Sequence, residues 1–127
     1  MKLITKEIEN RFREIGRQDV PNPIVVVKFF NPCGPGTWYA IEYDHENRIC
    51  FGYVTGLGYS EWGSFSVQEL EELKCPPLGL PIERDQYTSE KKITEHCPEL
   101  KFEIERREEI HAKQFLDKQT NDLDLDH

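Results

Sequence analysis

The feature that most constrains the fold is a run of β-branched and aromatic residues at positions 23–30, Pro-Ile-Val-Val-Val-Lys-Phe-Phe. Such side chains favour extended backbone, so the run predicts a strand. Its apolar residues are nearly continuous, which indicates burial on both faces in the middle of a sheet. Two further strand patterns follow at 37–43 and 48–54, after the short turns 31–36 and 44–47. Short connections between three consecutive strands predict an antiparallel meander.

Two helices are expected beside this sheet. Apolar residues at spacings of three and four predict a helix over 5–15, with Thr5 as its N-cap and Gly16 at its end. A serine followed three residues later by a glutamate forms a capping box in front of a short second helix at 67–74. The predicted fold class is therefore α+β: an antiparallel meander of three to four strands, flanked by an N-terminal helix and a short second helix.

The chain is expected to divide into a core domain, residues 1–90, and a charged C-terminal extension, residues 91–127. Part of the extension alternates as a strand would, and the part after it has a helix-forming composition with a poor apolar face. The alternating residues are Leu100, Phe102 and Ile104, and the helical composition covers 105–119. We expect a mostly helical extension whose last residues, 122–127, are flexible.

Composition limits the class of protein. A length of 127 residues suits one domain. No apolar run approaches the ~20 residues that a membrane span needs, and the N-terminus lacks the apolar centre of a signal peptide. A cytoplasmic protein that does not bind membranes is expected.

The charge balance bears on possible partners. The net charge is −8, from 24 acidic and 16 basic residues. Binding to phosphate backbones is driven by basic patches, so direct nucleic-acid binding is not expected. An acidic protein can instead occupy a basic groove on a protein partner. The simpler alternative is that the charge only keeps a small protein soluble.

No motif predicts catalysis, a metal site or a cofactor. The four cysteines form no Cys-x-x-Cys pair, so reduced thiols are expected. Glu108 and His111 make one Glu-x-x-His pair, whereas carboxylate-bridged metal sites need two. Ser60 lies between glycines that are one residue too far apart for a Gly-x-Ser-x-Gly elbow. An enzyme is left open, but a non-enzymatic protein is favoured.

Aromatic residues supply the first candidate binding residues. Alternation along the strand 37–43 places Trp38 and Glu42 on one face and Tyr43 on the other. A glycine-rich loop is expected over 56–63, and it contains the further candidates Tyr59 and Trp62. These aromatics are either covered by the helices or form an open rim that binds a partner.

The segment Gly79-Leu80-Pro81-Ile82-Glu83-Arg84-Asp85 supplies the remaining candidates, Glu83, Arg84 and Asp85. It follows two further prolines, which remove backbone donors and leave carbonyl groups without ladder partners. The five N–H donors of an arginine suit such carbonyls. A structural clamp, with Leu80 and Ile82 in the core, is therefore favoured over a functional site.

Several segments together resemble one bacterial family, catalogued as domain of unknown function 2958. The resemblance covers about residues 2–88 and implies a small stand-alone protein of plasmids, conjugative elements and phages, without an established activity or catalytic residues. The segments that carry it are Val20–Phe30, Trp38-Tyr39-Ala40, Phe51-Gly52, Glu61–Ser66, Glu69-Leu70 and Gly79–Asp85.

Three functional hypotheses follow. The first is a small, acidic, non-enzymatic accessory factor that binds another protein, in one form an inhibitor of a host defence or nucleic-acid-processing protein. The second is a small-ligand-binding protein or an enzyme, in which Glu42, Glu83 and Asp85 act with Arg84 beside an aromatic loop. The third is a homodimer joined through the C-terminal extension.

Overall fold

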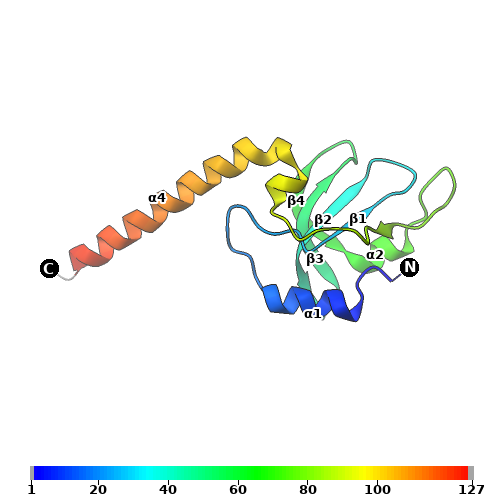
Figure 1. The fold of residues 1–127 in the computed structure, drawn as a ribbon, viewed down its shortest axis with the longest axis horizontal. Coiled ribbons are helices and arrows are strands. Elements are labelled where there is room, and N and C mark those ends of the chain that lie inside the picture. Colours follow the sequence, from blue (N-terminus) through cyan, green and yellow to red (C-terminus); the bar gives the residue numbers. More distant parts are fainter. Residues whose placement is uncertain (1, 126–127) are drawn as a thin grey trace.

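A five-stranded antiparallel sheet forms the centre of the computed structural model, which describes residues 2–125 and the side chains of residues 2–120 (Figure 1). The strand order is β4-β3-β2-β1-β5. The α+β class and the antiparallel meander are confirmed, with a strand count slightly above the three to four predicted. The strands are β1 (Val27–Phe30), β2 (Thr37–Asp44), β3 (Ile49–Thr55), β4 (Glu61–Ser66) and β5 (Glu83–Arg84).

Strand β4 occupies much of the region predicted as a loop over 56–63. The glycine-rich turn is shorter than expected: Gly56 and Gly58 have positive φ angles, and from Glu61 on the chain pairs with β3. Trp62 therefore lies in a strand, and its predicted loop position is wrong. The glycines favoured a loop in the sequence, whereas pairing with β3 makes these residues a strand.

One side of the sheet, here called the α1 face, packs against two helices. They are α1 (Lys6–Ile15) and α2 (Val67–Glu72), and both begin as predicted. Thr5 Oγ1 accepts from the Ile8 N–H, and Ser66 Oγ accepts from the Glu69 N–H. The core on this face is apolar throughout. It includes Leu3, Phe12, Phe29, Trp38, Ala40, Val67, Leu70 and Ile82.

A β-bulge in β2 changes which side chains share a face. The pairing with β3 passes from Ala40↔Gly52 to Glu42↔Phe51, so Ile41 is the extra residue. Tyr43 consequently packs with Trp38 in the core of the α1 face, and Glu42 lies on the opposite face. The predicted separation of Trp38 and Glu42 from Tyr43 is wrong because regular alternation does not continue through a bulge.

The other side of the sheet, here called the α3 face, is covered by the residues that follow β5. They form α3 (Ile93–His96), a 3₁₀ turn η1 (Pro98–Leu100) and α4 (Lys101–Leu125). Leu100 and Ile104 are buried, whereas Phe102 is 77% exposed. The alternation of Leu100, Phe102 and Ile104 therefore does not form a strand. Leu100 and Ile104 instead meet the sheet at the i, i+4 spacing of a helix.

Helix α4 leaves the rest of the molecule after its first turns and projects outward (Figure 1). The extension is thus mostly helical, as predicted. The backbone is helical to Leu125, and residues 126 and 127, for which a flexible end was also predicted, lie outside the described residues. The domain boundary at residue 90 stays a prediction. Within residues 2–125, no helix is both long and apolar enough to cross a membrane.

Candidate functional site

Arg84 holds the N-terminal segment of the chain. It lies in β5 opposite Phe29, on the α1 face. Its Nη1 donates to the carbonyl oxygens of Lys2, at 2.7 Å, and Leu3, at 3.1 Å. The predicted clamp is present, but it holds the start of the chain and not the proline-rich loop. Ile82 is buried as predicted, whereas Leu80 is 39% exposed.

Asp85 continues the attachment of β5 to β1. Its N–H donates to the Lys28 carbonyl oxygen at 2.9 Å, and its Oδ2 lies 3.2 Å from Lys28 Nζ. Burial alone would raise the pKa of Asp85, but the Tyr87 N–H and the Lys28 ammonium group favour the carboxylate and lower that pKa below its ordinary value. Glu83 pairs with Phe30 across the ladder. Each residue of the triplet thus has a contact within the fold.

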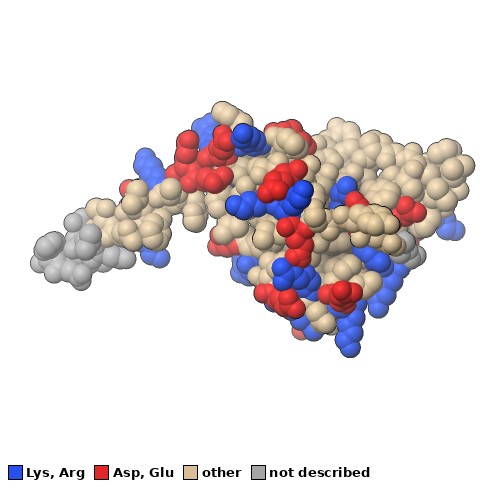
Figure 2. Space-filling view, in the orientation of Figure 1, with Lys and Arg blue, Asp and Glu red and all other residues tan. Residues whose placement is uncertain are grey.

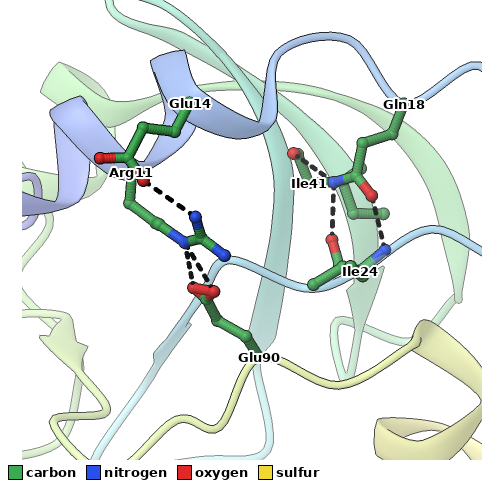
Figure 3. Close-up of polar contacts among 6 residues, drawn as sticks. All are labelled: Arg11, Glu14, Gln18, Ile24, Ile41 and Glu90. Carbon is green, nitrogen blue, oxygen red and sulfur yellow. Dashed lines mark hydrogen bonds and ion pairs between the residues drawn. The ribbon is translucent and has the colours of Figure 1, made fainter.

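Glu42 holds a different part of the chain. Its Oε2 accepts from the Gln18 N–H at 3.0 Å, beside the bulge. The Gln18 side chain in turn bonds both the N–H and the carbonyl of Ile24 and the carbonyl of Ile41 (Figure 3). These bonds satisfy backbone groups that the irregular segment would otherwise leave unpaired. Glu42 is therefore not brought together with Glu83, Arg84 and Asp85.

The largest cleft described, of about 500 Å³, lies between the end of α1 and the β2–β3 turn. Glu42 lines it, but Glu83, Arg84 and Asp85 do not. Its charged groups are largely used within the chain, because Glu9 Oε1 lies 2.7 Å from Arg13 Nη2 and 2.8 Å from His45 Nδ1. The arrangement proposed for a carboxylate-based site is not assembled there.

The cysteines offer no reactive thiol at their buried positions. Cys50, Cys75 and Cys97 are buried, and Cys33 is half-buried. Burial raises the pKa of Cys50 to about 12 and that of Cys97 to about 11, which keeps both thiols protonated at neutral pH. Within the described part of the chain, no three His, Cys, Asp or Glu side chains are grouped as metal ligands.

Of the three aromatic candidates, two belong to the packed structure. Trp38 is 6% exposed in the core of the α1 face. Trp62 packs on Tyr53 on the α3 face, with ring centroids 5.1 Å apart, and Arg107 of α4 lies 5.2 Å above its ring. This cation–π contact attaches α4 to the sheet. Tyr59 is exposed, in the turn between β3 and β4.

Three loops meet at the end of the sheet where Tyr59 lies, and we call them the loop end: residues 31–36, 56–60 and 75–82. Phe30, Thr37 and Thr55 lie in line across the strands, so all three loops leave the sheet at this end. Asp, Glu, Lys and Arg make up 31% of the chain but are absent from these loops. The charge-free surface occupies the upper right of Figure 2, where the loops lie in Figure 1.

The loop end displays apolar side chains on fixed backbone. Leu57 and Leu78 are 43% and 74% exposed. A Cβ atom on Gly56 would lie 2.1 Å from the Pro35 carbonyl oxygen, so the first two loops are in direct contact. In the third loop, Cys75 N–H donates to the Leu80 carbonyl oxygen at 2.7 Å. Sequence reasoning missed this surface, although three charge-free segments at one end of the meander could have indicated it.

Comparison with known proteins identifies the family. The profile of the family described as protein of unknown function (DUF2958) matches residues 3–103. The chain belongs to this family. No curated protein and no solved structure matches it.

The DUF2958 match includes the sheet and the elements packed against it, but not the projecting part of α4. It extends beyond about residue 88, where the resemblance found in the sequence ends, and includes α3 and the beginning of α4. The loop end, β4 and Arg84 all lie inside the matched residues. Most of α4 lies outside them. The family match therefore covers the sheet, its loops and the short helices on both of its faces.

Proposed function

We propose that this DUF2958 protein is a non-enzymatic binding protein that docks onto another protein through its loop end. The observation that carries the proposal is the convergence of three charge-free loops at one end of the sheet, two of which expose large apolar side chains. A large contiguous apolar patch on a soluble protein commonly marks an interaction site. The partner would present an apolar, uncharged patch of its own.

The energetics suit such an interface. Fully burying a leucine side chain is worth roughly 1.5–3 kcal/mol, and a few well-packed side chains dominate most protein interfaces. Leu57, Leu78 and Tyr59 are exposed in the free protein and are available for that burial. Their loops are already held by backbone contacts, so little conformational entropy is lost on binding.

The charge distribution favours the loop end over a general acidic surface. On the face shown in Figure 2, acidic and basic residues are interspersed over α1 and the beginning of α4. Several are paired within the chain, among them Arg11 with Glu14 and Glu90 (Figure 3). Competition for a basic groove is less favoured on this basis. An inhibitory role and a mobile-element setting stay predictions.

The test compares Leu78→Asp with Phe102→Asp, since the two residues are similarly exposed and only Leu78 belongs to the loop end. Tagged full-length protein captures a partner from cell lysate, and the isolated partner is then titrated with each variant by calorimetry. We expect at least about tenfold weaker binding for Leu78→Asp, corresponding to about 1.4 kcal/mol. Binding by Phe102→Asp should be unchanged. Equal binding by both variants would rule out the loop end.

A further inference from the structure

Strand β4 lies at one edge of the sheet, and half of its backbone polar groups point outward. The Val67 N–H donates to the Arg48 carbonyl oxygen at 3.0 Å, so the polar groups of Val67 point toward β3. Because the direction of the polar groups alternates along an antiparallel strand, the N–H and C=O of Trp62 and Ser64 point away from β3. These groups have no hydrogen-bond partner within residues 2–125.

This edge lacks the features that usually prevent pairing with another chain. Edge strands are commonly protected by lysine, proline or a bulge, or by being very short. β4 has six residues in unbroken register with β3, and its sequence Glu-Trp-Gly-Ser-Phe-Ser contains neither lysine nor proline. Its one charged residue, Glu61, is confined to its first position. At the opposite edge, β5 has only two residues. The longer edge is thus the open one.

Gly63 adds an independent observation. A glycine inside a strand weakens it, and such a glycine often marks a close approach by another backbone or a ligand. Its neighbour across the ladder, Gly52, is required by the fold because a Cβ atom there would lie 1.8 Å from the Tyr39 carbonyl oxygen. A Cβ atom on Gly63 would have no neighbour within 4 Å. The fold of the described residues therefore does not require this glycine.

We propose that the β4 edge binds an extended segment of a partner protein as a sixth strand of the sheet. This inference rests on the proposed function as a protein-binding protein. The segment exchanges backbone hydrogen bonds with Trp62 and Ser64. It places a large apolar side chain over Gly63, where an aromatic residue can cover an edge glycine. An extended polypeptide is the occupant that matches donors and acceptors repeated at the two-residue spacing of a strand.

A heterologous segment fits the edge better than a second copy of this chain. Pairing two six-residue strands buries far less than the roughly 1,000 Å² expected of a specific dimer, and each copy carries a net charge of −8. A short segment needs less buried area because main-chain hydrogen bonds supply much of its affinity. β4 begins two residues after Tyr59, so one partner can contact both the edge and the loop end.

The experiment selects phage-displayed random peptides, of about strand length, on the full-length protein. Binders are then titrated against Ser64→Pro and the control Ser64→Ala. Because the Ser64 N–H points outward, proline removes no bond to β3 and the variant should fold, which circular dichroism checks. We expect at least about tenfold weaker binding for Ser64→Pro, unchanged binding for Ser64→Ala, and selected peptides that share a large apolar residue. Peptides that bind both variants equally would overturn the proposal.

Two further measurements separate the possibilities. Gly63→Val places a side chain where the apolar side chain of the peptide would lie, so it should weaken peptide binding. It should raise the midpoint of thermal unfolding, because a glycine inside a strand is destabilising. Light scattering that shows a wild-type dimer and a Ser64→Pro monomer would overturn the proposal, because a second copy would then occupy the edge. A partner that loses affinity for Leu78→Asp but binds Ser64→Pro normally would contradict this inference and leave the proposed function intact.

Discussion

Arg84 Nη1 donates to the carbonyl oxygen of Leu3, 81 residues earlier in the chain, at 3.1 Å. The same nitrogen lies 2.7 Å from the Lys2 carbonyl oxygen. Leu3 is fully buried in the core of the α1 face, so the guanidinium group fixes the segment that delivers this side chain. The arginine thus joins the edge strand β5 to the start of the chain.

Arg84→Ala should therefore destabilise the protein. Two charge-assisted hydrogen bonds to backbone carbonyls are lost, and we expect a decrease of about 1–3 kcal/mol in the free energy of unfolding. Urea denaturation measures it, with Arg84→Lys as a partial replacement. Unchanged stability together with lost partner binding would show that Arg84 belongs to a binding site instead.

Asp85 should make stability depend on pH. Its pKa is lower in the folded protein than in the unfolded chain, so the folded state is stabilised above the unfolded pKa. That contribution is lost as the pH falls through the folded pKa. We expect Asp85→Asn to be less stable than wild type at pH 7, with the difference shrinking in acid. A difference that is independent of pH would show that the carboxylate charge is not involved.

The meander and the two capped helices could be predicted because they depend on local signals. The β-branched run before Phe30, the hydroxyl of Thr5 and the short turns each act over a few residues. The class α+β followed from the order of these elements. A clamping role for Arg84 was also predicted, but for the carbonyl groups beside the prolines, whereas Arg84 binds those of Lys2 and Leu3.

The predictions failed where the structure depends on pairing or packing between residues far apart in the sequence. β4 forms because Trp62 and its neighbours find a partner in β3, despite the glycines before them. Glu42 changed faces through a bulge that regular alternation does not reveal. The alternation at Phe102 looked strand-like, whereas Leu100 and Ile104 pack as one helical face. Only the assembled sheet shows which side chains lie together, and the loop end could be recognised only then.

Gly63 and Gly52 should respond oppositely to substitution by alanine. Gly63→Ala meets no atom within 4 Å and restricts the unfolded chain, so we expect stabilisation of about 0.5–1 kcal/mol. Gly52→Ala would place its Cβ 1.8 Å from the Tyr39 carbonyl oxygen and should cost about 3 kcal/mol or prevent folding. Thermal unfolding followed by circular dichroism distinguishes them. Destabilisation by Gly63→Ala would mean that the fold itself needs this glycine.

The outer part of α4 should contribute little to folding. Buried side chains end at Ile104 within the described part of the helix, and Phe115 and Leu116 are about 60% exposed. A chain that ends at Gln114 should therefore have a midpoint of thermal unfolding within a few degrees of that of the full chain.

Ile104→Ala, by contrast, should lower the free energy of unfolding by about 2–5 kcal/mol because it leaves a cavity against the sheet. Thermal unfolding at several protein concentrations measures both effects. A midpoint that rises with concentration only in the full chain would instead support the predicted homodimer through the extension.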